Sequence, residues 1–311
     1  MYHDASWNAK HLGNVYGITL DTEGHMYVAA HGLYGAYRPL HHRYGDLGGG
    51  AADLNAAGTV YKIHRITGVV SVFAVIPGQQ IMALSSGLMS GPGLGNLTYD
   101  ATHNQFFVTS LEDGKIYRVN SAGTVVQIFD PMTADNGAAG LPPLRERLWA
   151  IEVNSDAVFY SVWNSGTTTD PGKIRRVNIL PSGALNTSSD TEVLTVPGKS
   201  YAYHSVPVSD LTFSSDNLTM VLGERSMFKP TYSYNHRSGT HIATLTGTTW
   251  SVTKTMATGC NSSLGEGYGG VAFGDDAGNP EGTIWTSSAD MRDNYGPHGL
   301  FGVRTTDFPT T

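Results

Sequence analysis

The stretch GNLTYDATHNQFFVTSLEDGKIYRVNSAGTV, Gly95–Val125, decides the fold. It reads as three short β-strands separated by turn residues. In the segment GKIYRVN, Ile116 and Arg118 point to one side while Tyr117 and Val119 point to the other, which is the alternation of a strand. The Asp and Asn residues of DATHN supply the turn that precedes the second strand.

Similar strings recur along the chain, and their order predicts the architecture. A small antiparallel sheet has two apolar faces that it cannot bury alone, whereas sheets stacked around an axis cover one another. We therefore predict an all-β protein, a β-propeller of five four-stranded blades, with six blades as the alternative. Two β-sandwich domains are the rival fold, but a sandwich does not require the same strand order in every copy. The opening strands of the five copies start near Asn14, Leu94, Leu148, Val208 and Gly269.

The propeller is expected to occupy residues 1–311 as a single domain, with a long loop inserted in the first blade at about 31–57. The fifth copy ends at its third strand. Its fourth strand is expected from the N-terminal segment MYHDASWNAKHL, which would close the ring. This segment has no apolar signal-peptide core, so either the protein is cytosolic or the chain is a mature or trimmed piece of a longer precursor, and we expect the latter.

Composition narrows the class of partner. Charged residues make up 14% of the chain, the formal net charge is -7, and there are 38 glycines, a balance that fits an extracellular protein with many tight turns. No Lys/Arg run is present, which argues against a nucleic-acid partner. No run approaches the length of a membrane span, so membrane insertion is not expected. A single cysteine, Cys260, excludes a structural cysteine metal site.

The inserted loop, HGLYGAYRPLHHRYGDLGGGAADLNAAG, is the most distinctive segment. Long loops in compact domains are functional or disordered. Tyr and Arg side chains favour a binding surface, and a Tyr/His pair beside Arg is also the pattern of a polysaccharide lyase. The alternative is a solvated loop whose tyrosines pack on the propeller edge. The candidate ligand-binding residues are Tyr34, Tyr37, Arg38, His41, His42 and Tyr44 in this loop, together with Trp149.

Oxygen-bearing side chains near the starts of the innermost strands could converge on the central channel and bind Ca²⁺. The alternative is that they cap strand ends and hold channel waters. A further acid, Glu224, lies beside Arg225 at the end of a strand in GERSMFKPTYSYNHRSG, where an ion pair within a structural loop is expected. The candidate metal ligands are Asn14, Asn96, Glu146 and Asp210.

In general style the blades resemble NHL and SMP-30/gluconolactonase-like propellers. A closer resemblance is to the propeller domain of large bacterial secreted or cell-surface proteins of unassigned function. It is carried by GNVYGITLDTEGHMYVAA, AAGTVYKIHRITGVVSVFA, GPGLGNLTYDATHNQFFVTSLEDGKIYRV, IFDPMTADNGAAG, ERLWAIEV, FYSVWN, PVSDLTFSSDNLTMVLGERSM and GLFGV, which together span nearly the whole chain.

The resemblance to SMP-30-like propellers implies a divalent ion held by a carboxylate and an Asn/Asp set. Asn96, Glu146 and Asp210 match this set by residue type. No second carboxylate lies beside Asp210 in the sequence to act as a general base. The closer resemblance, to bacterial secreted or cell-surface proteins, implies a propeller outside the cytoplasm and no established chemistry.

These observations predict an extracellular or cell-surface interaction or structural module that binds a protein or glycan partner or associates with itself. The alternative is a metal-assisted, lactonase-like hydrolase or a polysaccharide lyase at the mouth of the channel. The fold cannot decide between them, since propellers host both.

Overall fold

The structure is a computed structural model that describes Trp7, Leu12 and residues 14–31, 58–77, 93–132, 142–199, 205–229, 232–233, 237–258, 267–288 and 299–307. Its strands form antiparallel sheets in sequence order, each running from an innermost to an outermost strand, and the fold is a five-bladed β-propeller, as predicted. Four of these sheets have four strands, and the fifth has three described strands.

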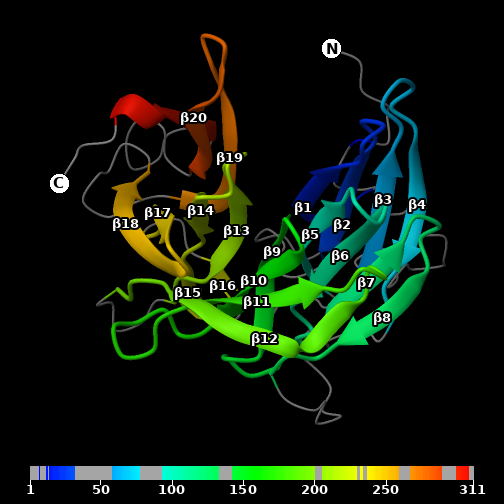
Figure 1. The fold of residues 1–311 in the computed structure, drawn as a ribbon, viewed down its shortest axis with the longest axis horizontal. Helices are drawn as coiled ribbons and strands as arrows, with labels where there is room; N and C mark the ends of the chain where they lie inside the picture. Colours follow the sequence, from blue (N-terminus) through cyan, green and yellow to red (C-terminus); the bar gives the residue numbers. More distant parts are fainter. Residues whose placement is uncertain are drawn as a thin grey trace. The chain divides into compact units, whose positions relative to one another are not determined.

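The blades follow the chain without crossovers (Figure 1). The first sheet contains β1 (Asn14–Leu20), β2 (Met26–His31), β3 (Thr59–Ile63) and β4 (Val70–Val75). The second contains β5 (Leu94–Asp100), β6 (Gln105–Ser110), β7 (Ile116–Asn120) and β8 (Val125–Phe129). The third contains β9 (Arg147–Asn154), β10 (Ala157–Trp163), β11 (Lys173–Ile179) and β12 (Leu185–Thr195).

The fourth sheet contains β13 (Val208–Phe213), β14 (Thr219–Glu224), β17 (Gly239–Thr246) and β18 (Thr249–Ala257), and the connection from β14 to β17 forms the small hairpin of β15 (Met227–Lys229) and β16 (Tyr232–Ser233). The fifth sheet contains β19 (Gly267–Asp276), β20 (Asn279–Ser288) and β21 (Gly299–Arg304), followed by the short 3-10 helix η3 (Thr305–Asp307). The innermost strands thus start within two residues of the positions predicted from the sequence.

The chain forms two compact units, Met1–Tyr160 with Arg176–Thr191 and Ser161–Arg175 with Glu192–Thr311, so the division falls within the third sheet. In the first unit, β1 lies beside β5 and β5 beside β9. The first and second blades interdigitate through apolar side chains, with the rings of Tyr27 and Phe106 4.4 Å apart. This is the burial of sheet faces by neighbouring blades that the repeat pattern predicts.

Hydroxyl groups reinforce contacts between neighbouring blades. Thr109 of β6 donates a hydrogen bond to the Trp149 carbonyl on β9 at 2.5 Å. In the second unit, Ser161 of β10 donates to the Val208 carbonyl on β13 at 2.7 Å. Both hydroxyls are buried, so each bond satisfies a carbonyl that water does not reach.

In the second unit β13 lies beside β19, and a smaller apolar core joins the fourth and fifth blades through Val221, Ile242, Val271 and Ile284. The predicted fourth strand of the fifth blade falls in the N-terminal segment, which, except for Trp7 and Leu12, lies outside the described residues. The inserted loop lies outside them from residue 32 to residue 57. Among the described residues, no helix is long and apolar enough to cross a membrane.

Candidate functional site

A buried group of ionisable side chains crosses one face of the fourth blade. Glu224 ends β14, and His241 lies in β17, where it pairs in register with Leu222. Because side chains two residues apart share a face of a strand, Glu224 and His241 lie diagonally across that face. His241 Nε2 is 2.8 Å from Glu224 Oε1, and both side chains are 1% exposed.

A lysine from outside the sheet completes the group. Lys199 follows β12, and its backbone N–H donates to the Gly166 carbonyl at 3.0 Å, which fixes the segment. Its ammonium Nζ donates to Glu224 Oε2, and the Gly239 backbone N–H donates to the same oxygen at 3.0 Å. Both carboxylate oxygens of Glu224 therefore face donors. We call Lys199, Glu224 and His241 the buried charge cluster.

Electrostatics keep Glu224 ionised. Its burial would raise the pKa, but the charges and hydrogen bonds of His241 and Lys199 outweigh burial and lower the pKa to about 2. A buried carboxylate held in this way is strongly destabilised if one partner is removed. Sequence reasoning expected an ion pair for Glu224 and named Arg225 as its neighbour. It missed Lys199 and His241, which lie 25 and 17 residues away in the chain.

His241 links the cluster to the surface. Its Nδ1 is 2.8 Å from the hydroxyl Oγ1 of Thr255, an exposed residue on the outer strand β18. The Glu224 carboxylate beside Nε2 and the Thr255 hydroxyl beside Nδ1 hold the ring from both sides. The imidazole is thereby fixed in orientation.

Further polar atoms are buried at the same end of the fourth and fifth sheets. The hydroxyls of Ser226, Thr258 and Ser288 are fully enclosed, and none has a hydrogen-bond partner within the described part of the chain. Ser238 donates to the Gly267 carbonyl nearby at 2.5 Å. Buried polar groups of this kind ordinarily hold water or a polar ligand.

Two of the predicted metal ligands, Asn96 and Asp210, bind backbone N–H groups. Asn96 Oδ1 accepts the Leu97 N–H at 2.8 Å. Asp210 accepts the N–H groups of Leu211 and Val271 at 3.0 and 2.9 Å, one on each carboxylate oxygen. These bonds support the capping interpretation of both residues.

The remaining predicted site residues are scattered. Glu146 is half-buried in the turn before β9. Asn14 begins β1, and its side chain is outside the description. Trp149 is fully buried in β9, with its ring edge-on to Tyr16 at 5.4 Å, which is a core position. The six loop candidates between Tyr34 and Tyr44 lie outside the described residues, so their roles stay predictions.

A second ionisable group occupies the β1–β2 turn, where Asp21, Glu23 and His25 offer ligand atoms within 4.8 Å of one another. Each is already engaged in the turn. Asp21 Oδ1 accepts the N–H groups of Glu23 and His25 at 3.0 and 2.8 Å, and its Oδ2 accepts the Tyr27 hydroxyl. His25 Nδ1 accepts the Arg65 N–H at 3.2 Å, which places the ring proton on Nε2, facing Glu23. These contacts stabilise the turn and leave Nε2 without a lone pair for a metal.

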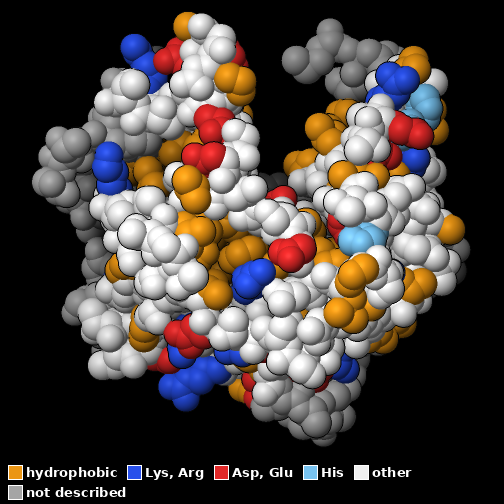
Figure 2. Space-filling view, in the orientation of Figure 1, with side chains coloured by type: hydrophobic (Ala, Val, Ile, Leu, Met, Phe, Trp, Pro, Cys, Tyr) orange, Lys and Arg blue, Asp and Glu red, His pale blue; other side chains and the backbone are white. Residues whose placement is uncertain are grey.

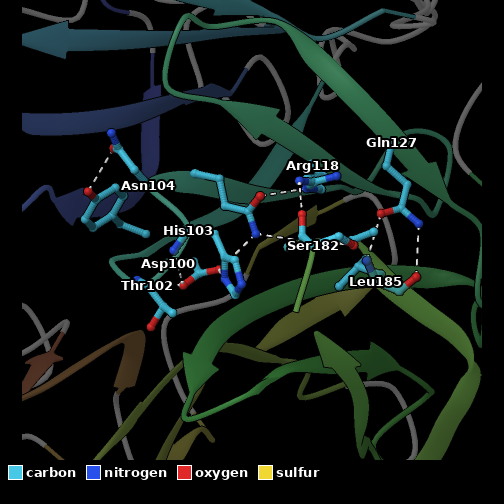
Figure 3. A network of polar contacts seen from close by, with 12 residues as sticks. Asp100, Thr102, His103, Asn104, Arg118, Gln127, Ser182 and Leu185 are labelled. Carbon is cyan, nitrogen blue, oxygen red and sulfur yellow. Dashed lines mark hydrogen bonds and ion pairs between the residues drawn. The ribbon is translucent and has the colours of Figure 1, made fainter. Parts of the chain in front are cut away.

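A polar network joins the second blade to the β11–β12 turn (Figure 3). Buried Asp100 binds His103 Nδ1 at 2.7 Å and the Gln105 amide at 2.8 Å. Gln105 also donates to the Gly183 carbonyl at 2.8 Å and accepts from Arg118 Nε at 2.6 Å. The network holds a neighbouring turn in place and is structural in character.

Comparison with known proteins supports the fold. No family model matches the chain, and no curated protein matches it in sequence. A chain of a nidogen/laminin complex is 10% identical, with a TM-score of 0.51 over 93% of this chain and 84% of that chain. The Dos1 propeller is 7% identical, with a TM-score of 0.50 over 97% of this chain and 61% of its own.

A periplasmic gluconolactonase of Pseudomonas aeruginosa is 13% identical, with a TM-score of 0.49 over 92% of this chain and 72% of its own. At these identities similarity speaks for fold alone. The resemblance to bacterial surface proteins stays a prediction, and the chain is similar in structure to β-propellers.

Proposed function

We propose that this chain is a binding module, a propeller that recognises a protein partner outside the cytoplasm through the outer strands of its first two blades. The observation that carries the proposal is an exposed, uncharged apolar surface on β4 and β8. Val72 and Val75 of β4 are 42% and 47% exposed, and Val126 and Ile128 of β8 are 46% and 52% exposed. We call these four residues the outer apolar surface.

The first and second blades approach each other near these strands, because Gly123 in the β7–β8 turn packs against the Phe73 carbonyl of β4. Hydrophobic side chains reach the surface over β7 and β8 (Figure 2). Exposed apolar groups gathered in this way mark interaction sites in soluble proteins.

Charge separates these strands from the other outer strands. VSVFAV in β4 and VVQIF in β8 contain no charged residue. By contrast, β12 carries Asp190 and Glu192, and β18 carries Lys254. Charged side chains on outer strands prevent unwanted association, and their absence from β4 and β8 favours contact with a partner.

The geometry favours binding through side chains. Both strands carry a register shift, at Phe73 in β4 and at Val126 in β8. Such bulges twist an edge and hinder the addition of a further strand. A protein with a complementary apolar patch is therefore the proposed partner. The similarity to a chain of a nidogen/laminin complex agrees with a propeller that binds protein.

The hydrolase and lyase alternatives receive less support. Asn96 and Asp210, two of the predicted metal ligands, already bind backbone N–H groups. Calcium binding by these residues stays a prediction that isothermal titration of the chain with Ca²⁺ can test.

The test compares the wild-type chain with the double variant Val72→Lys/Ile128→Lys. The matched control is Ser251→Lys, an exposed position on β18. Circular dichroism first confirms that all three proteins are folded. Each protein is then immobilised and exposed to extract from cells that carry the chain, and the bound proteins are quantified by mass spectrometry. We expect a protein that is retained by the wild type and the control and lost from the double variant. Equal retention by all three, or retention of glycans alone, contradicts the proposal.

A further inference from the structure

The buried charge cluster brings a primary amine into contact with a carboxyl group inside the protein. Lys199 Nζ touches Glu224 Oε2, and the carboxyl group is 1% exposed. Lysine amines are nucleophiles once they lose a proton. The pair therefore has the two groups from which an amide is made.

Burial changes the balance between the ion pair and the amide. In water, hydration stabilises both ions, and abundant water drives any amide toward hydrolysis. Inside a protein the charges lose much of that hydration, so the ion pair is less favoured over the neutral amide than it is in water. The fold also holds the two groups together, which replaces a collision between separate molecules with a fixed approach.

The neighbours of Glu224 can activate its carbonyl carbon. The Gly239 N–H donates to Oε2 at 3.0 Å, and His241 Nε2 lies 2.8 Å from Oε1. Donors on the oxygens draw electron density from the carbon and stabilise the tetrahedral intermediate that an attacking amine forms. His241 is thus a positioning residue that also faces the oxygen that develops charge.

We propose that Lys199 and Glu224 condense to form an intramolecular amide cross-link. The bond that forms joins Nζ to Cδ of Glu224, and the bond that breaks joins Cδ to Oε2. Of the three ammonium protons, one stays on the amide nitrogen and two leave with Oε2 as a water molecule, so charge and atoms balance without any oxidant or cofactor. Oε1 remains as the amide carbonyl facing His241. The Lys199 side chain is 20% exposed, which gives the released water a way out.

The cross-link would tie the segment after β12 to the end of β14 across a separation of 25 residues. The amide would replace the ion pair between Lys199 and Glu224 with a covalent bond, which closes the stretch of chain between the two residues into a loop. Cross-links that close loops of this size restrict the unfolded chain and stabilise the folded one.

A second Lys–Glu ion pair in the same chain serves as a control for the effect of burial. Lys173 and Glu192 form an ion pair at 2.6 Å between the same residue types, but their side chains are 37% and 33% exposed. Water reaches both groups, and the Glu192 carboxylate also accepts the Thr195 hydroxyl at 2.8 Å. We expect this pair to remain uncondensed.

The test is intact-mass and peptide-mapping mass spectrometry of the full chain. The expected mass is lower than the sequence mass by one water molecule, and digestion is expected to yield a branched peptide that joins Lys199 to Glu224. Lys199→Met and Glu224→Leu should each restore the mass of their own sequence, whereas Lys173→Met should keep the deficit of one water. His241→Gln should lower the condensed fraction several-fold.

An intact mass equal to that of the sequence, with Lys199 and Glu224 recovered in separate linear peptides, overturns the proposal. So does a water loss that survives in Lys199→Met, because the deficit then lies elsewhere. Both results are read on the wild-type or a single variant after denaturation, so they do not depend on whether a variant folds.

Discussion

Asp210 in the innermost strand of the fourth blade accepts the backbone N–H of Val271 in the innermost strand of the fifth, at 2.9 Å. Its other carboxylate oxygen accepts Leu211 N–H at 3.0 Å, beside a register shift in the β13–β14 pair. One side chain thus caps a bulge in its own blade and fixes the next blade to it. In the second blade, Asn96 caps its own bulge in a comparable way.

Asp210→Ala is expected to destabilise the protein by about 1–3 kcal/mol, because the Val271 N–H is left without its acceptor next to a buried side chain. The measurement is the urea unfolding midpoint followed by circular dichroism. Asp275→Ala is the control, since Asp275 is exposed and only accepts a turn N–H at 3.2 Å. A change of less than roughly 0.5 kcal/mol is usual for such surface positions. Equal effects of the two variants would contradict the interblade role of Asp210.

The sequence was sufficient to predict the propeller because each blade carries its own strand alternation and turn residues. Asn14, Leu94 and Val208 begin strands where the repeats place them. Local pattern is enough for that, since the pairing within a blade joins strands that follow one another in the chain.

The buried charge cluster could not be predicted in the same way. Lys199 follows one blade while Glu224 and His241 lie in the next. The register of β14 with β17 places His241 diagonally opposite Glu224, and the fold of the segment after β12 brings Lys199 to them. Asn96 and Asp210 could be identified from the sequence as oxygen-bearing residues near the starts of innermost strands. Their bonding to backbone N–H groups depends on bulges and neighbouring blades that a residue pattern does not encode.

Gly123→Ala is expected to cost more stability than Gly278→Ala. Both glycines have positive φ angles, 79° and 91°, so each alanine carries a backbone penalty of roughly 1–2 kcal/mol. At Gly123 the added Cβ would also lie 1.9 Å from the Phe73 carbonyl oxygen, whereas at Gly278 it meets nothing within 4 Å. The difference between the two thermal midpoints isolates the contact between the first and second blades. Similar midpoints would show that the close contact between Gly123 and Phe73 adds nothing to the stability of the protein.

Asp113→Asn is expected to change the pH dependence of stability. Burial raises the pKa of Asp113 above its ordinary 3.8, despite hydrogen bonds from Tyr117 and Ser110 that lower it. The folded state therefore binds the proton more tightly than the unfolded chain, and wild-type stability should fall as pH rises from 3.8 through the folded pKa. The variant lacks this titration. Urea unfolding between about pH 3.5 and 7, which spans the ordinary carboxyl pKa, should show the free energy of unfolding of the variant rising relative to that of the wild type as pH rises. Parallel curves would contradict the raised pKa.

Gln127→Leu is expected to loosen the start of β12 without affecting the adjacent turn. The Gln127 side chain accepts the Leu185 N–H at 2.8 Å and donates to the Leu185 carbonyl at 3.1 Å, so it binds both backbone groups of one residue (Figure 3). Its loss should speed hydrogen exchange at the Leu185 amide, because exchange follows local opening.

Gln105→Leu provides the matched comparison for this exchange experiment. Gln105 donates to the Gly183 carbonyl, while the Gly183 N–H is bound by the Leu180 carbonyl within the turn itself. That variant removes one link between the turn and the second blade, so protection should fall at Gly183, while Leu185 stays bound to Gln127. In Gln127→Leu only Leu185 should lose protection, because Gln105 and Arg118 still hold the turn. If Leu185 keeps its protection in Gln127→Leu, the amide is held by the strand pairing of β12 and the side chain adds nothing to it.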